Sequence, residues 1–119
     1  MQQIRIARHV NNLDEMIVFY KKIGFEVIGE FNDHAGYSGV FMSMHDAYHL
    51  EFTVSDEKTD SKHNEDDLLV FYCENDEEYS KIRLQFENDI MPKNPYWIDK
   101  GFMVTDPIGQ NIMICKMKW

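Results

Sequence analysis

Glu51 is the residue best placed to do chemistry, because it is an acid within a segment that otherwise reads as a buried strand. His49 shares its face, since side chains alternate along a strand. Arg5 and His9 share a face of another predicted strand, 4–10. A guanidinium pairs with a carboxylate, and a histidine carries protons near neutral pH. We therefore predict Glu51 and His49 as catalytic candidates and Arg5 and His9 as ligand-binding neighbours.

Two further groups of side chains are candidates for contacting a ligand. His34 and Tyr37 fall in 32–38, which we predict to be a loop at the mouth of a pocket. Tyr96 and Trp97 follow a proline, and their rings can stack on a planar or cationic molecule. The alternative for His34 and Tyr37 is a plain surface loop, and the alternatives for Tyr96 and Trp97 are core packing or a dimer contact.

An internal repeat positions these candidates. The predicted hairpin 39–54 recurs as 101–115, a step of 62 residues from Gly39 to Gly101. The same step carries Glu51 onto Met113. An acid in one copy therefore matches a thioether in the other. Met113 joins the ligand-binding candidates as a weak, soft ligand.

Each half of the chain predicts the order strand, helix, strand, strand, strand. Asn12 and Asn75 each precede a glutamate by three residues, a variant of the capping box that opens a helix. We therefore predict an α+β fold of paired βαβββ modules, with a curved mixed sheet around a pocket. The modules span about 1–54 and 67–119 of a single domain, and a polar connector covers 55–66.

Length and composition exclude several classes of protein. A chain of 119 residues suits one domain, and a net charge of −9 argues against nucleic-acid binding. No apolar run approaches the roughly 18 residues of a membrane span, and the start lacks a secretory signal. We expect a cytoplasmic protein in which Cys73 and Cys115 are reduced packing residues.

Three local motifs carry a resemblance to a known family. They are Phe-Tyr-Lys-Lys-Ile-Gly-Phe at 19–25, Leu-Glu-Phe-Thr at 50–53 and the Asp-Pro-Ile-Gly turn at 106–109. With the paired modules, the whole chain resembles the vicinal oxygen chelate superfamily. This superfamily includes glyoxalase I, extradiol dioxygenases, fosfomycin resistance enzymes and bleomycin resistance proteins. More narrowly, the chain looks like a small bacterial glyoxalase-like protein, and the resemblance implies a homodimer.

The resemblance also implies four metal-ligand places, on the first and last strands of each half. Here they hold Arg5, Glu51, Met113, and either Leu68 or Asp67 depending on how the repeat is counted. Only Glu51 matches the usual ligands, because an arginine stays protonated. We expect no metal, with the guanidinium neutralising Glu51 instead. If that pair is buried, replacing Arg5 with leucine costs about 3–5 kcal/mol.

The favoured interpretation is a bleomycin-resistance-like protein that binds a small cationic or aromatic molecule around Glu51 and Arg5. One alternative is a glyoxalase I- or dioxygenase-type enzyme whose divalent metal is held by Glu51 with His49 or Asp67. Another is a metal-free isomerase or lyase that uses Glu51 or His49 as its base.

Overall fold

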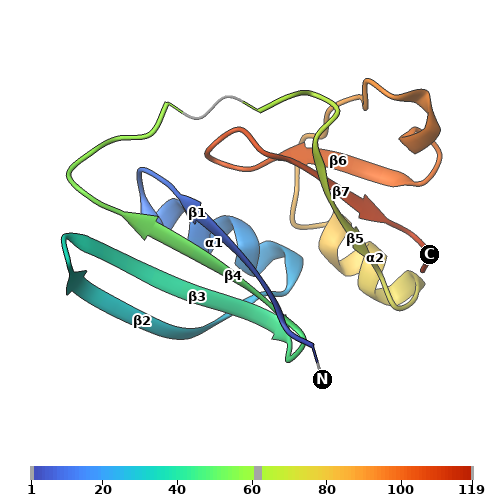
Figure 1. The fold of residues 1–119 in the computed structure, drawn as a ribbon. Helices are drawn as coiled ribbons and strands as arrows, with labels where there is room; N and C mark the ends of the chain where they lie inside the picture. Colours follow the sequence, from blue (N-terminus) through green and yellow to red (C-terminus); the bar gives the residue numbers. More distant parts are fainter. Residues whose placement is uncertain (1, 61–62, 119) are drawn as a thin grey trace. The chain divides into compact units, whose positions relative to one another are not determined.

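A computed structural model describes residues 2–60 and 63–118 of the chain. These residues divide into two compact units, one within 1–60 and the other within 61–119 (Figure 1). Each unit carries one α-helix and one β-sheet, so the predicted α+β class is confirmed. None of the helices in the described part of the chain is long and apolar enough to cross a membrane.

The first unit is a four-stranded sheet with one helix. Its elements are β1 (Ile4–His9), α1 (Leu13–Ile23), β2 (Glu26–His34), β3 (Tyr37–His45) and β4 (Tyr48–Val54). The strand order is β1-β4-β3-β2. β1 runs parallel to β4, and the other neighbours are antiparallel. The first half thus has the predicted order of elements.

Local signals set both ends of α1. The side chain of Asn12 accepts a hydrogen bond from the backbone N–H of Glu15 at 3.0 Å, as the capping pattern predicts. Gly24 ends the helix with φ of 119°, a left-handed conformation that favours glycine. The apolar side of the helix then faces the sheet.

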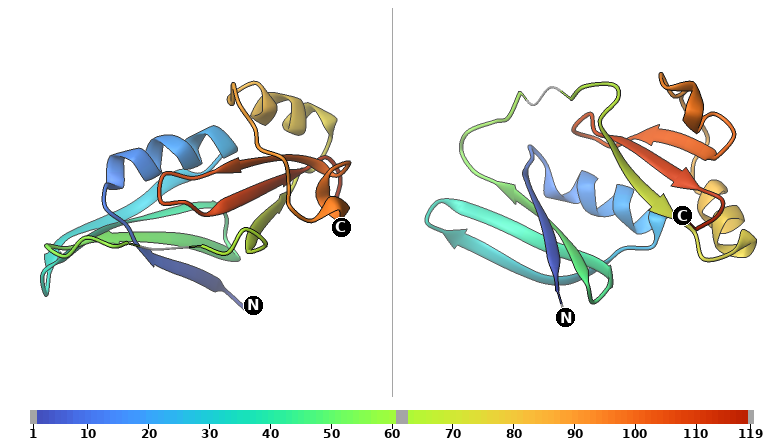
Figure 2. Two further views of the ribbon diagram at one scale, coloured as in Figure 1. Left: turned by 90° about the horizontal axis from the view of Figure 1, so that it is seen from above. Right: turned by 45° about the vertical axis from the view of Figure 1, so that its right-hand side comes forward.

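Tyr20 lies at the centre of the first core and is fully buried. Its ring centroid is 5.1 Å from that of Phe52 on β4 and 5.7 Å from that of Phe25. Met42 and Leu50 are also buried. Because α1 covers one side of the sheet (Figure 2), the alternate residues of the strands lie on a side without a helix.

The predicted loop 32–38 is wrong. β2 and β3 extend through it, and His34 pairs with Tyr37 across a turn of two residues. Both turn residues have positive φ, 53° at Ala35 and 88° at Gly36, which suits a tight hairpin. The sequence pattern concealed this because polar residues occupy both faces of the hairpin tip.

The second unit has a smaller, three-stranded sheet. Its elements are β5 (Leu68–Tyr72), α2 (Asp76–Arg83), the 3-10 helix η1 (Pro95–Trp97), β6 (Gly101–Thr105) and β7 (Asn111–Cys115). The strand order is β5-β7-β6. The strand expected between the helix and the hairpin is reduced, among the described residues, to an isolated bridge from Ile90 to Met103.

The second unit has apolar side chains on both sides of its sheet. Towards α2, the ring of Phe102 lies 5.8 Å from that of Tyr79. On the opposite side, buried residues on β6 and β7 form an apolar cluster against which β5 and η1 pack; its members are Met103, Met113, Cys115, Leu68, Val70 and Trp97. Here the segment that replaces the missing strand contributes Trp97 to the core.

The Asp-Pro-Ile-Gly segment at 106–109 forms a turn before the last strand, as its sequence predicts. One Asp106 carboxylate oxygen accepts hydrogen bonds from the backbone N–H groups of Ile108 and Gln110 at 3.1 and 3.0 Å. Gly109 has φ of 94°. The polar connector predicted at 55–66 lies between β4 and β5, and its residues 61–62 fall outside the described chain.

Candidate functional site

Arg5 and Glu51 meet on the helix-free side of the first sheet. β1 and β4 are parallel neighbours, in which Arg5 pairs with His49 and Ala7 pairs with Glu51. Side chains at these positions share a face. The Arg5 Nη1 atom lies 3.8 Å from Glu51 Oε1. We call this side, with Arg5, His9, Phe41, His49 and Glu51, the open face.

Phe41 completes the surroundings of Arg5. The guanidinium carbon lies 4.6 Å from the centroid of the Phe41 ring, a cation–π contact. Phe41 is also the cross-strand partner of Glu51 in the β3–β4 hairpin. The sequence reasoning missed Phe41, although alternation along the hairpin places it opposite Glu51. The ring and the carboxylate together hold the arginine side chain in place.

The ion pair is not buried. The side chain of Arg5 is 50% exposed and that of Glu51 is 18% exposed. Water therefore screens the pair, and such pairs contribute about 0–1 kcal/mol. The cost of 3–5 kcal/mol that applies to a buried pair does not apply here. Partial exposure leaves both charged groups accessible to a ligand.

The histidines lie at two ends of the open face. His49 is two residues from Glu51 on β4, about 7 Å along the strand. His9 Nε2 lies 3.0 Å from the hydroxyl of Ser55, and its ring centroid is 6.1 Å from that of Tyr37. Thus His49 is beside the ion pair, whereas His9 is about 13 Å along β1 from Arg5.

Tyr37 reaches the open face through His9, but His34 stands at the exposed hairpin tip. Tyr96 and Trp97 lie in the second unit, where both line a cavity of about 330 Å³. The two pairs of ligand-binding candidates therefore belong to different units. Their roles stay predictions.

The strand register decides between the two candidates for the third ligand place. Arg5 pairs with His49, and Leu68 pairs with Asn111, the residue one hairpin step of 62 beyond His49. Leu68 is therefore the structural counterpart of Arg5. Asp67 precedes β5.

These residues do not suit a divalent metal. Two of the four places, Leu68 and Met113, belong to an apolar cluster, and Met113 is fully buried. A third holds a guanidinium, which repels a cation. Within 2–60 and 63–118, no three side chains of histidine, cysteine, aspartate or glutamate come together as a metal site would require.

The two thiols are poor nucleophiles. Cys73 and Cys115 are free and buried. Burial, with a smaller contribution from Glu78, raises the pKa of Cys73 to about 11. Burial also raises the pKa of Cys115, although Lys100 opposes the shift. Both groups stay protonated at neutral pH, so neither supplies a reactive thiolate.

Family models match both halves of the chain. Residues 4–53 match the YycE-like N-terminal domain, and residues 66–116 match the YycE-like C-terminal domain. The chain belongs to the YycE-like family. The protein YycE of Bacillus subtilis (strain 168) is 40% identical to it, over 98% of this chain and 88% of that protein.

Solved structures place the YycE-like fold among glyoxalase and resistance proteins. The crystal structure of Bacillus subtilis YycE, described as a candidate glyoxalase/fosfomycin resistance protein, has a TM-score of 0.87 and 38% identity. The match covers 98% of this chain and 90% of that one. The resemblance to the vicinal oxygen chelate superfamily is thus confirmed.

A more distant structure shares the fold alone. The Listeria monocytogenes fosfomycin resistance protein FosX, as an E126Q mutant with Mn(II) and a dihydroxypropylphosphonic acid, has a TM-score of 0.69. It is 14% identical, over 96% of this chain and 90% of its own. The YycE-like chain shares that fold but carries Arg5, Leu68 and Met113 where metal-using members are expected to have ligands.

Proposed function

We propose that this protein binds a small organic molecule on the open face, with Arg5 and Glu51 at the polar centre and no metal ion between protein and ligand. The observation that best supports this proposal is the position of the Arg5 guanidinium. It lies over the ring of Phe41, and its Nη1 atom is 3.8 Å from Glu51 Oε1. A fixed cation thereby occupies the place where metal-using members are expected to have a metal ligand.

The exposed parts of Arg5 and Glu51 indicate which chemical groups a ligand should carry. Half of the Arg5 side chain is exposed, so a planar ring can stack on the guanidinium on the side away from Phe41. The partly exposed carboxylate of Glu51 accepts hydrogen bonds from an ammonium, amidine or hydroxyl group. A small molecule with an aromatic ring and a cationic or hydroxyl group therefore suits the open face best.

Calorimetric titration of chelator-treated protein tests this proposal. The probes are bleomycin, catechol and the adduct of methylglyoxal with glutathione, which differ in charge and ring content. We expect bleomycin or catechol to bind, and Arg5→Gln and Glu51→Gln each to weaken that binding roughly tenfold, about 1.4 kcal/mol. Both variants should keep the free energy of unfolding within about 1 kcal/mol, because the pair is exposed.

Two charge-matched variants serve as controls. Lys21→Gln on α1 and Glu30→Gln on β2 remove exposed charges from the same unit outside the open face, since Glu30 pairs with the buried Val40 on the helix side of the sheet. Both should bind the probe like the wild type. Equal affinity in all four variants, or no binding of any probe, would contradict the proposal.

A further inference from the structure

A cavity is lined wholly by residues of the second unit and shares no residue with the open face. It has a volume of about 330 Å³, near the lower end of the roughly 300–1,000 Å³ of small-molecule sites. Its lining comes from the ends of β5 and β7, from η1 and from the residues next to them: Tyr72, Tyr96, Trp97, Asp99, Lys100, Cys115, Lys116, Met117 and Lys118.

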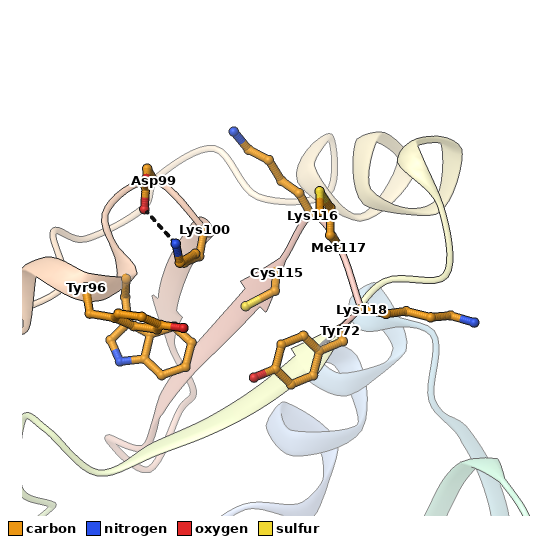
Figure 3. A pocket seen from close by; sticks show the side chains of 9 residues that line it. Tyr72, Tyr96, Asp99, Lys100, Cys115, Lys116, Met117 and Lys118 are labelled. Carbon is orange, nitrogen blue, oxygen red and sulfur yellow. Dashed lines mark ion pairs between the residues drawn. The ribbon is translucent and has the colours of Figure 1, made fainter.

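Aromatic rings form opposite walls of this cavity. Figure 3 shows Tyr96 on one side and Tyr72 on the other, with Cys115 between them. The Tyr96 and Trp97 rings meet edge to face, with centroids 5.0 Å apart. Trp97 also packs against the apolar cluster of the second unit, which fixes that wall. A flat ring can insert between such walls.

The hydroxyls of Tyr72 and Tyr96 and the ammonium of Lys100 supply hydrogen-bond donors at the cavity. The hydroxyls of Tyr72 and Tyr96 point towards each other across it (Figure 3). Partial burial raises the pKa of Tyr72, and the neighbouring Cys115 and Tyr96 raise it further, so that hydroxyl stays protonated. The Lys100 ammonium lies 4.8 Å from the centroid of Tyr96. A ligand that carries a hydrogen-bond acceptor would therefore match these groups.

The charge around the cavity differs from that of the whole chain. Three lysines line it against one aspartate, whereas the protein carries a net charge of −9. Asp99 already pairs with Lys100 at 3.5 Å. Lys116 and Lys118 extend away from the cavity (Figure 3), and Lys118 pairs with Glu74 at 2.7 Å. With Asp99 and Glu74 counted against the three lysines, a net charge of +1 remains at the cavity, which favours an anion over a cation.

We infer that this cavity binds a small planar aromatic carboxylate, with its ring between Tyr72 and Tyr96 and its carboxylate at the Lys100 ammonium and the two phenol hydroxyls. We assign this site to binding and not to thiol chemistry, because burial raises the pKa of the adjacent Cys115 and keeps its thiol protonated. It differs from the open face in the residues that form it and in the charge of its ligand.

Nuclear magnetic resonance titration of the full chain with benzoate tests this inference. Benzamide and benzamidine are neutral and cationic probes of similar shape. We expect benzoate to shift the backbone amides of residues 72, 96, 100 and 115, and to bind at least fivefold tighter than either analogue. Lys100→Gln should weaken benzoate roughly five- to tenfold. Tyr72→Phe should weaken it less, since the ring remains.

Matched variants separate this site from general charge effects and from the open face. Lys93→Gln removes a lysine that pairs with Glu65 outside the cavity, and it should bind benzoate like the wild type. Glu51→Gln should also leave benzoate binding unchanged. Absence of benzoate binding, equal binding of benzamidine, or equal loss in Lys93→Gln and Lys100→Gln would overturn the inference without touching the proposal for the open face.

Discussion

Met113→Glu should destabilise the protein by about 4–6 kcal/mol at pH 8, because it places an acid in an apolar core. Met113 is fully buried in the cluster that Trp97 packs against. A carboxyl in such surroundings has its pKa raised by several units, to about 8–9 in documented cases. The substitution would place an acid in the second copy of the repeat, at the position that corresponds to Glu51 in the first copy.

The pH dependence of this variant has a definite sign. Because the folded-state pKa lies above the unfolded value of about 4.3, the ionisation penalty is absent below that value and grows as pH rises towards the folded pKa. Urea unfolding at pH 5 and pH 8 should therefore show a larger loss at pH 8. Glu51→Met is the reciprocal control and should change stability by less than about 1 kcal/mol. Equal losses in the two variants would contradict this account of the repeat.

Gly101→Ala should destabilise the protein by about 3 kcal/mol or more. A Cβ atom at Gly101 would overlap the carbonyl oxygen of Ile114 on β7 and would lie 3.0 Å from the Cα atom of Cys115. These are backbone atoms, so β6 and β7 would have to move apart. The expected readout is a reduced urea midpoint with an unchanged slope.

The chain offers graded controls for this prediction. At Gly39, the repeat counterpart, an added Cβ would meet the side chain of Phe31 at 2.6 Å and the Phe52 carbonyl oxygen at 2.8 Å, so we expect a smaller loss. At Gly29 the nearest atom is 3.5 Å away, an ordinary contact, and Gly29→Ala should be nearly neutral. A Gly101→Ala variant as stable as Gly29→Ala would show that our assignment of close backbone approach is wrong.

Local signals explain which parts of the fold are predictable from sequence. The helices beginning after Asn12 and Asn75 follow from side chains that bond to backbone three residues later. The Asp106 turn is equally local, since one carboxylate satisfies the turn's own N–H groups. Such features depend on neighbours in sequence and need no knowledge of the rest of the chain.

Features that depend on distant contacts were harder to predict. The ligand places implied by the family resemblance correctly brought Arg5 and Glu51 together, but their exposure depends on what covers that face. The loss of a strand before β6 is not visible in the pattern, because Tyr96 and Trp97 suit a strand as well as a 3-10 helix. The sequence reasoning also missed Lys100, although it lies only four residues beyond Tyr96 and its backbone N–H donates a hydrogen bond to the Trp97 carbonyl at 3.1 Å.

Titration of Mn²⁺ and Zn²⁺ into chelator-treated protein tests most directly the central claim that Arg5 takes the place of a metal ion beside Glu51. Glu51→Gln and the exposed-acid control Glu30→Gln are titrated in parallel. We predict that all three proteins give the same weak, non-stoichiometric signal. One tightly bound equivalent in the wild type and in Glu30→Gln, lost in Glu51→Gln, would contradict the claim and establish Glu51 as a metal ligand.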